Sequence, residues 1–369
     1  MSSMSIKLFQ TRQSLKNNLR TRNLHFKEQN MDTVLKSHNY FNFFNGLETI
    51  YLKSTSPKHY ENVKLDDFMN LYSFDKEICC ILSSYLDTVE EKLKASISYH
   101  FASIHCVTLQ DTMQYTNPDN YMNPANNNPG TPTYCRYSSA YPFANFQNKK
   151  IYNGFYKYRL FLSFFLTNLI NGYDHIDASF YQDASYCAPS NVAIYKDSSN
   201  VFHRDIAVPF WVAIETLTFG EILWLLNYLQ DDVMEKVLLD FNLPLSKRAQ
   251  FLNMIDILLC LRNSCAHTTL INRFRTPKKY HLNSLLISSF SLNPKNADSV
   301  LSLYDTVKIL NYFTDIKTLA KPFQKLKIQT YRSFGIRKGK ETYKKILARM
   351  GCNSYNEWKI LFKGIKYSL

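Results

Sequence analysis

Residues 65–101, LDDFMNLYSFDKEICCILSSYLDTVEEKLKASISYHF, carry the clearest periodic pattern in the chain. From residue 78 onward the apolar side chains recur every three or four positions, at Ile78, Leu82, Tyr85, Val89, Leu93 and Ile97. The charged side chains Asp87, Glu90, Lys92 and Lys94 fall between them. This spacing is typical of an amphipathic helix with one buried stripe. We therefore predict a helix over Leu65–Phe101.

The composition agrees with a helical protein. The 369 residues include 26 Phe and 26 Tyr but only 9 Gly, which suits packed helices better than a turn-rich β-sandwich or barrel. A chain of this length can bury one large core or two smaller ones. The expected fold class is all-α or nearly so, with additional helices and long loop insertions around a helical core.

The organisation along the chain suggests three regions. Residues 1–34 form a basic N-terminal segment, 35–316 a helical core, and 317–369 a basic C-terminal helical region. Within the core, residues near 108–150 and 174–200 are rich in Asn, Pro and other polar residues, which predicts loop insertions. Helical character returns at about Tyr152–Leu169 between them.

Two helix starts are visible before residue 270. Thr218 and Glu221 have the spacing of a capping box, in which each side chain bonds the other's backbone N–H. A second helix is expected to start near Ser246, after Pro244, and its apolar middle, Phe251–Leu261, should lie in the protein's centre.

Three polar residues follow this apolar helix. Arg262, Asn263 and His267 are costly at the end of a buried segment unless they are hydrogen-bonded or used in a function. Ideal geometry stacks Asn263 over His267, whereas Arg262 and His267 lie about 140° apart around the helix. The last two meet only if the helix bends, the arginine wraps round, or a second subunit contributes. Without further information, capping of a buried helix end is the more frequent use of such a polar pair.

The same region resembles a known family. The run LRNSCAHTTLINR, residues 261–273, resembles the core of the abortive-infection (Abi) family, and its Arg262-x4-His267 spacing resembles the motif of HEPN ribonucleases. Further similarity, over roughly residues 35–275 and part of the tail, lies in Leu71–Asp75, Val89–Glu90, Pro209–Trp211, Leu217–Gly220, Met350–Gly351 and Trp358. The likeness is strongest to AbiD/AbiF-type members. Lys94 and Thr268 depart from the pattern, and Lys94 with His100 resembles a degraded second basic–His pair.

The resemblance implies a HEPN-like helical bundle and a metal-independent ribonuclease toxin of phage defence. Arg262, Asn263 and His267 would be its catalytic residues: histidine can transfer protons near neutral pH, and arginine binds phosphate oxygens. One histidine per chain supplies one of two proton transfers, so we expect a homodimer. The alternative is a non-catalytic RNA-binding protein in complex with a structured noncoding RNA.

Net charge favours an anionic partner. The formal charge is +14, and residues 317–366 hold fourteen Lys and Arg against Glu341 and Glu357, with tyrosines interleaved. We expect RNA contacts, with phosphates on the cations and unpaired bases on the rings. The predicted RNA-binding residues are Arg273, Arg275, Lys325, Lys327, Arg332, Arg337, Lys338, Lys340, Lys344 and Lys345. A solvated helix face or an acidic membrane surface are the alternatives, although no lipid motif is present.

Cysteine spacing and hydropathy exclude other classes. The eight cysteines show no CxxC or Cys/His ligand spacing, so we expect buried free thiols, no disulfide framework, no metal site and no cofactor. The apolar stretch Leu160–Ile170 is too short to span a bilayer, and Ala207–Leu229 carries Glu215 and Glu221. With no signal peptide visible at the N-terminus, we expect a cytoplasmic protein without a membrane partner.

Overall fold

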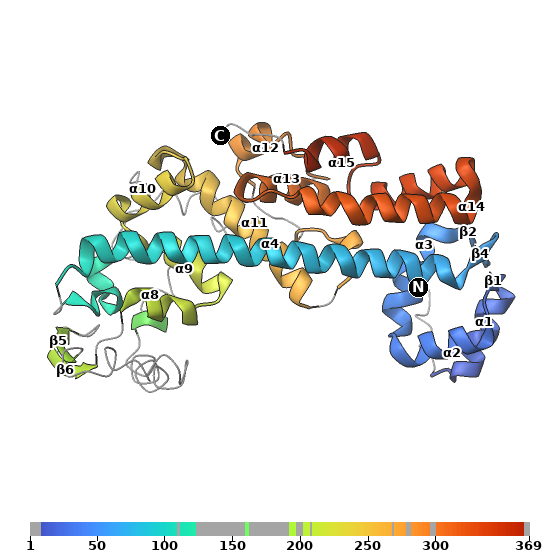
Figure 1. The fold of residues 1–369 in the computed structure, drawn as a ribbon, viewed down its shortest axis with the longest axis horizontal. Helices are drawn as coiled ribbons and strands as arrows, with labels where there is room; N and C mark the ends of the chain where they lie inside the picture. Colours follow the sequence, from blue (N-terminus) through green and yellow to red (C-terminus); the bar gives the residue numbers. More distant parts are fainter. Residues whose placement is uncertain are drawn as a thin grey trace, which may run out of the picture.

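In the computed structural model, one long helix runs the length of the molecule and the other elements pack along it (Figure 1). This helix, α4 (Leu65–His105), contains the predicted segment and extends it by one turn. Its first turn carries Asp66 and Asp67, which favour a helix N-terminus. The structure describes residues 9–108, 111–122, 159–161, 192–196, 202–206, 209–267, 269–277, 282–295 and 300–364.

Three groups of helices surround α4 in the described part of the chain. Near its start lie α1 (Arg12–Thr21), α2 (Glu28–Ser37), the π-helical turn η1 (Phe41–Asn45) and α3 (Gly46–Tyr51). Near its end lie α8 (Phe210–Ala213), α9 (Phe219–Tyr228) and α10 (Asp231–Asp240). Along its middle lie α11 (Arg248–Ala266), α12 (Ser284–Ser289), α13 (Leu303–Phe313) and α15 (Tyr355–Phe362), and α14 (Ala320–Arg349) extends from there to the start of α4, beside α3. The mostly helical class is confirmed.

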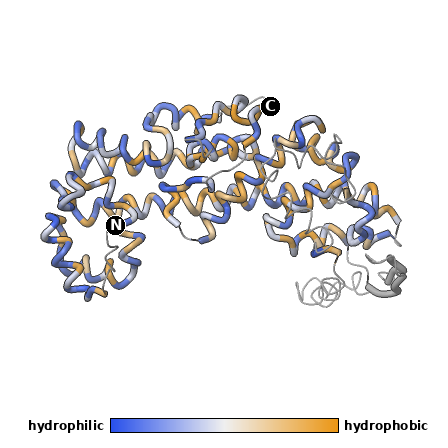
Figure 2. The backbone as a smooth tube through the Cα atoms, turned by 180° about the vertical axis from the view of Figure 1, so that it is seen from behind, coloured by the Kyte–Doolittle hydropathy of each residue, from blue (hydrophilic) through white to orange (hydrophobic). Residues whose placement is uncertain are grey.

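The core follows the buried stripe of α4. Leu82, Leu86, Val89, Leu93 and Ile97 are at most 1 % exposed. They pack within one hydrophobic cluster that also contains the buried residues of α9, α11 and α14. Hydrophobic and hydrophilic positions alternate turn by turn along the helices, as expected for amphipathic segments (Figure 2). No helix in the described residues combines the length and apolar character needed to cross a membrane.

Both predicted helix starts before residue 270 are confirmed. Thr218 accepts a hydrogen bond from the Glu221 N–H, and the Glu221 carboxylate accepts one from the Thr218 N–H at 2.8 Å, which completes the capping box of α9. After Pro244, a short 3₁₀ turn (Leu245–Lys247) leads into α11. The middle of α11 is buried on every side, as its apolar sequence indicated.

The strands within the described residues are short and form three two-stranded pairs. β1 (Leu24–His25) pairs in parallel with β4 (Val63–Lys64), and β2 (Leu52–Thr55) forms a hairpin with β3 (Lys58–Tyr60). β5 (Val192–Lys196) pairs with β6 (Phe202–Ile206) in an antiparallel hairpin. The expectation of a loop over 174–200 is therefore wrong at residues 192–196, because a backbone pairing that the polar composition did not indicate forms there.

Other predicted segments can be compared with the structure only where it describes their residues. The predicted insertion near 108–150 is described over residues 111–122, which form short 3₁₀ turns, η3 (Gln114–Thr116) and η4 (Pro118–Asn120). The predicted helix at Tyr152–Leu169 lies outside the described residues except for η8 (Arg159–Phe161), which is a 3₁₀ turn. The basic N-terminal segment folds into α1 and most of α2, and its Lys16 pairs with Asp32 at 2.8 Å.

The basic tail folds into a helical hairpin that packs on the core. At Gly335 the backbone of α14 leaves helical geometry, with φ +76°, a conformation that favours glycine. The Tyr343 hydroxyl donates a hydrogen bond to the Phe323 carbonyl, 20 residues away, at 3.0 Å. In a straight helix those residues would lie about 30 Å apart. The chain therefore reverses direction at Gly335.

The tail is also joined to the rest of the protein. Phe323 packs edge-on against Phe74 of α4, with ring centroids 5.1 Å apart. Trp358 is 1 % exposed, packs against Phe323, and donates its indole N–H to the Cys352 carbonyl at 3.0 Å. The hydrophobic core thus continues from α4 into the basic tail.

Candidate functional site

The end of α11 carries the predicted catalytic residues out of the core. Arg262 is half-buried, whereas Asn263 and His267 are exposed. The backbone N–H of His267 donates to the Asn263 carbonyl at 3.0 Å, so the helical hydrogen-bonding pattern continues to the last turn without a bend. Because the helix is regular here, Arg262 lies about 140° around the axis from His267.

A pocket of about 380 Å³ lies beside the end of α11. His267, Arg273 and Arg275 line it, so the structure brings together one predicted catalytic residue and two predicted RNA-binding residues. The remaining described lining residues are Phe41, Asn42, Gly46, Ser264, Thr269, Leu270 and Phe274. No Asp or Glu is among these, so the pocket has a positive electrostatic character. Arg262 and Asn263 do not line it.

A buried carboxylate holds the loop that presents Arg273. Asp75 of α4 is fully buried and accepts three hydrogen bonds, from the Ile271 N–H at 3.1 Å and from the Asn272 N–H and side-chain amide at 2.7 Å each. Burial raises the pKa of Asp75 to about 6, against the opposing effect of these hydrogen bonds. The following residue, Arg273, is thereby fixed at the rim of the pocket.

Arg275 lines the pocket, and Arg349 of α14 is bonded to it and to Gly46, another lining residue. Arg275 donates to the Phe274 carbonyl at 2.6 Å and to the Arg349 carbonyl at 2.8 Å, and burial lowers its pKa. Arg349 donates to the Gly46 carbonyl at 3.0 Å and contacts Thr49. Burial, with Arg273 and Arg275 nearby, lowers the pKa of Arg349 to about 10. Arg275 therefore has a structural use, which leaves Arg273 as the arginine with the freer side chain.

Sequence reasoning missed two features of the pocket. Arg349 was counted only among the cations of the tail, yet it bonds to Gly46, which lines the pocket, and to Asn272 at 3.4 Å, each more than 70 positions away. Phe41 is close in sequence to the buried Phe43 and Phe44, but it is 66 % exposed and lines the pocket. The π-helical turn η1 shifts the helical register there, and such turns are frequent at functional sites.

The possible second basic–His pair is divided between two separate contacts. Lys94 is buried and lies 3.2 Å from the Glu90 carboxylate and 3.4 Å from that of Glu215. His100 bonds to Asp240 at 2.9 Å. Both residues thus connect α4 to neighbouring elements.

The cysteines of the described chain are free thiols, as expected, but not all are buried. Cys80 is exposed, and Cys106 and Cys260 are partly exposed. The described residues contain no group of three or more His, Cys, Asp or Glu arranged to hold a metal ion.

The basic tail separates into paired and unpaired cations. Lys325 lies 3.1 Å from Glu77, Lys338 3.1 Å from Glu61, and Arg337 3.8 Å from Glu341. By contrast, four predicted RNA-binding residues line a groove between the α14 hairpin and α15 and form no ion pair with a described residue; they are Lys327, Arg332, Lys340 and Lys344. Lys345 is exposed outside this groove.

These features define a helical protein with two cationic surface sites, one beside an exposed histidine and one in the C-terminal hairpin. Comparison with known proteins agrees with the sequence resemblance: the model of the Abi-like protein family matches residues 33–272. The chain therefore belongs to the Abi-like protein family, which places it among abortive-infection proteins of phage defence. No curated protein and no solved structure matches the chain.

Proposed function

We propose that this protein acts in abortive infection as a metal-independent, HEPN-type endoribonuclease whose active site includes His267. The observation that carries the proposal is the pocket at the end of α11, where His267 lies with Arg273 and without a lining carboxylate. An imidazole beside fixed positive charge suits a reaction that moves protons around a phosphate. We also propose that the protein is of the AbiD/AbiF-like subtype.

The reaction follows from the groups present. The RNA 2′-oxygen attacks the adjacent phosphorus and loses its proton to a base, while an acid protonates the departing 5′-oxygen. The products are a 2′,3′-cyclic phosphate and a 5′-hydroxyl end. His267 serves as one of the two proton-transfer groups, and Arg273 stabilises the charge that develops on the phosphate oxygens.

A second chain supplies the second proton-transfer group. The Arg262 side chain forms no hydrogen bond or ion pair with a described residue, and it lies on a different side of α11 from the pocket. In a symmetric dimer with the two α11 ends facing each other, both His267 residues and both Arg262 residues share one site. Asn263, exposed one turn before His267, orients the substrate or the partner histidine.

Substitution of the pocket residues tests the proposal. His267→Ala should lower RNA cleavage by about 10²- to 10⁴-fold, the usual contribution of a proton-transfer group. It should also abolish growth arrest on expression, and Arg262→Ala and Arg273→Ala should weaken both. The matched control is His59→Ala, because His59 is an exposed histidine on β3, away from the pocket.

Two measurements make the result specific. Cleavage by the wild-type protein should persist in excess chelator, and the fragments should end in cyclic phosphate. If His267→Ala cleaves RNA and arrests growth as the wild type does, the catalytic proposal is wrong.

A second candidate function is favoured by the groove in the tail. Its unpaired cations suit a protein that holds a structured noncoding RNA without cutting it. Sequencing of RNA that co-purifies with the wild type and with His267→Ala separates the two functions. One defined RNA of unchanged length in both samples, without cleavage activity in either, favours the binding function.

A further inference from the structure

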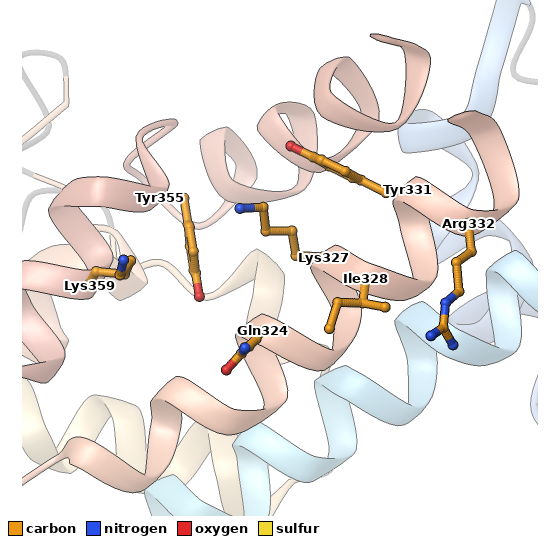
Figure 3. Close-up of a pocket in the computed structure, with 7 residues that line it drawn as sticks. All are labelled: Gln324, Lys327, Ile328, Tyr331, Arg332, Tyr355 and Lys359. Atoms are coloured by element: carbon orange, nitrogen blue, oxygen red, sulfur yellow. The ribbon is translucent and has the colours of Figure 1, made fainter. Parts of the chain in front are cut away.

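The groove of the C-terminal hairpin is made of two adjoining hollows. One, of about 590 Å³, lies between the first half of α14 and α15, and the other, of about 380 Å³, between the second half of α14 and the start of α15. They share Lys327, Tyr331 and Tyr355. These three side chains therefore occupy the middle of one continuous groove, as Figure 3 shows for the larger hollow.

The charges along the groove all have one sign. Arg332 and Lys359 line the larger hollow, and Lys340 and Lys344 the smaller one, on either side of the shared Lys327. None of these five cations forms an ion pair with a described residue, and no Asp or Glu is among the described lining residues. A row of unpaired cations without acidic neighbours is suited to successive phosphates of a polyanion.

The aromatic side chains give the groove a second property. Tyr331 and Tyr355 are both half-buried, and the Lys327 ammonium lies 5.6 Å from the centroid of the Tyr331 ring and 4.8 Å from that of Tyr355. In Figure 3 the Lys327 side chain extends between the two rings. A cation over two aromatic faces is held only weakly at a solvent-accessible position. Another planar or cationic group can therefore displace it.

We propose that this groove binds single-stranded RNA, with an unpaired base stacked on Tyr331 or Tyr355 in the place of the Lys327 ammonium. Lys327 then moves to a phosphate, and the neighbouring cations contact the phosphates on either side. Duplex RNA does not fit this arrangement, because its bases are stacked on one another and closed to aromatic side chains. The inference rests on RNA as the partner in the proposed function and does not depend on cleavage at His267.

Binding of matched oligonucleotides tests the proposal on the full-length protein. A labelled single-stranded 12-mer and its blunt duplex are compared by fluorescence anisotropy, and a 2-aminopurine in the single strand reports stacking through quenching. Tyr331→Leu keeps an apolar side chain but removes the aromatic face, and it should raise the Kd for the single strand about 5- to 150-fold, the range for one lost base stack. Tyr331→Phe should bind and quench as the wild type does.

Two neighbouring lysines test whether the positive charge within the groove contributes to binding. Lys344→Ala should weaken binding, whereas Lys345→Ala removes the same charge from the same helix outside the groove and should leave the Kd unchanged. Thermal unfolding of each variant establishes that it is folded. Duplex binding as tight as single-strand binding, equal loss in Lys344→Ala and Lys345→Ala, or stronger capture by anionic vesicles than by RNA would each overturn the proposal.

The outcome is separable from that of the proposed function. Tyr331→Leu should lose binding at low RNA concentration, while His267→Ala should lose cleavage and bind the 12-mer with unchanged affinity. If His267→Ala cleaves normally but Tyr331→Leu binds poorly, the groove is supported and the catalytic proposal fails. If Tyr331→Leu binds and quenches as the wild type does, the groove proposal fails, whatever the cleavage results.

Discussion

Asp75 and Asn272 are joined by two hydrogen bonds of 2.7 Å, across 197 positions of the sequence. Asp75 lies on α4, and Asn272 lies in the loop after α11. Two separate segments of the family resemblance, the one ending in Phe74-Asp75 and the one ending in Asn272-Arg273, thus meet in a single contact. The contact fixes the residue before Arg273, so part of the run 261–273 that resembles the Abi-family core has a structural role.

Replacing Asp75 should therefore destabilise the protein. Asp75→Ala leaves the buried N–H groups of Ile271 and Asn272 without their acceptor, and each such group costs about 1–3 kcal/mol. We expect the free energy of unfolding to fall by roughly 2–4 kcal/mol in urea titrations. Asp87→Ala, an exposed carboxylate on the same helix, should change it by less than about 0.5 kcal/mol. Equal stability of the two variants would contradict the role given to Asp75.

Stability should also depend on pH through Asp75. Its pKa in the folded protein is raised to about 6 from the ordinary 3.8, so between these values the folded state binds more protons than the unfolded state. The contribution of Asp75 is then fully present below pH 3.8 and is lost as the pH rises through 6. Two pKa units correspond to about 2.7 kcal/mol. In Asp75→Asn the side chain does not ionise, so this pH dependence of the stability is absent.

Unfolding of wild type and Asp75→Asn over pH 4–7.5 measures the effect. The wild type should gain stability relative to the variant as the pH is lowered, with most of the change between about pH 6 and 4. Parallel profiles for the two proteins would show that Asp75 does not titrate in this range.

The sequence predicted the helices well because their signals are local. The periodicity of residues 65–101, the capping box at Thr218 and the apolar run before Arg262 each depend on neighbours within four positions. The β5–β6 pairing depends on contacts between segments ten residues apart and left no clear periodic signal. The reversal at Gly335 was missed because a glycine in a cationic segment indicates flexibility but not the direction in which the chain continues.

The sequence analysis identified only those residues of the candidate site that lie close together in the sequence. His267, Arg273 and Arg275 lie within nine positions of one another, and the sequence analysis named all three, His267 as catalytic and the two arginines as RNA-binding. Phe41 and Arg349 reach the same region through tertiary packing of α3, α4 and α14, which no local pattern reveals. Likewise, local sequence could not show that Lys325 and Lys338 are paired with carboxylates on α4 and on the loop after β3, because those partners lie 248 and 277 positions away.

The proposed shared site predicts the behaviour of mixed dimers. Dimers that combine one wild-type chain with one His267→Ala chain can be isolated with two different affinity tags. If one site needs both histidines, mixed dimers should be nearly inactive, whereas independent chains should retain about half of the activity. Half activity, or a protein that sediments as a monomer while it cleaves RNA, would contradict the shared site.

Salt dependence should distinguish the groove cations from the paired ones. For single strands, the logarithm of the binding constant falls with the logarithm of salt concentration by about 0.7 for each phosphate neutralised. Lys344→Ala should therefore reduce the slope by about 0.7, because Lys344 is unpaired in the groove. Lys338→Ala should leave the slope unchanged, because Lys338 already pairs with Glu61 at 3.1 Å.

These point variants are preferable to removal of residues 317–369. That truncation would expose the core surface that Phe323 and Trp358 cover, and it would remove Arg349, which bonds to the pocket residues Gly46 and Arg275. A loss of binding in the truncated protein would not separate the groove from the fold. If Lys338→Ala and Lys344→Ala change the salt slope equally, the division into paired and unpaired cations has no bearing on RNA binding.

The close packing of the α14 hairpin gives the last prediction. A Cβ atom at Gly339 would lie 2.8 Å from the Cα of Tyr331 and 3.0 Å from the Thr330 carbonyl oxygen. Both are backbone atoms, so the two halves of the hairpin must separate to admit a methyl group. Gly339→Ala should therefore lower the free energy of unfolding by about 1–3 kcal/mol, as overpacking usually does. It should also weaken single-strand binding, because Tyr331 shifts within the groove.

Gly220→Ala is the matched control, because the same methyl group is added inside helix α9, where the nearest side-chain atom, of Leu259, is 3.9 Å away. There the lower entropy of the unfolded chain should stabilise the protein by about 0.5–1 kcal/mol. Urea unfolding and 12-mer binding of both variants measure the two effects. If Gly339→Ala is as stable as Gly220→Ala, the two halves of α14 are not in close contact at Tyr331. If Gly339→Ala binds RNA normally, the groove does not depend on that contact.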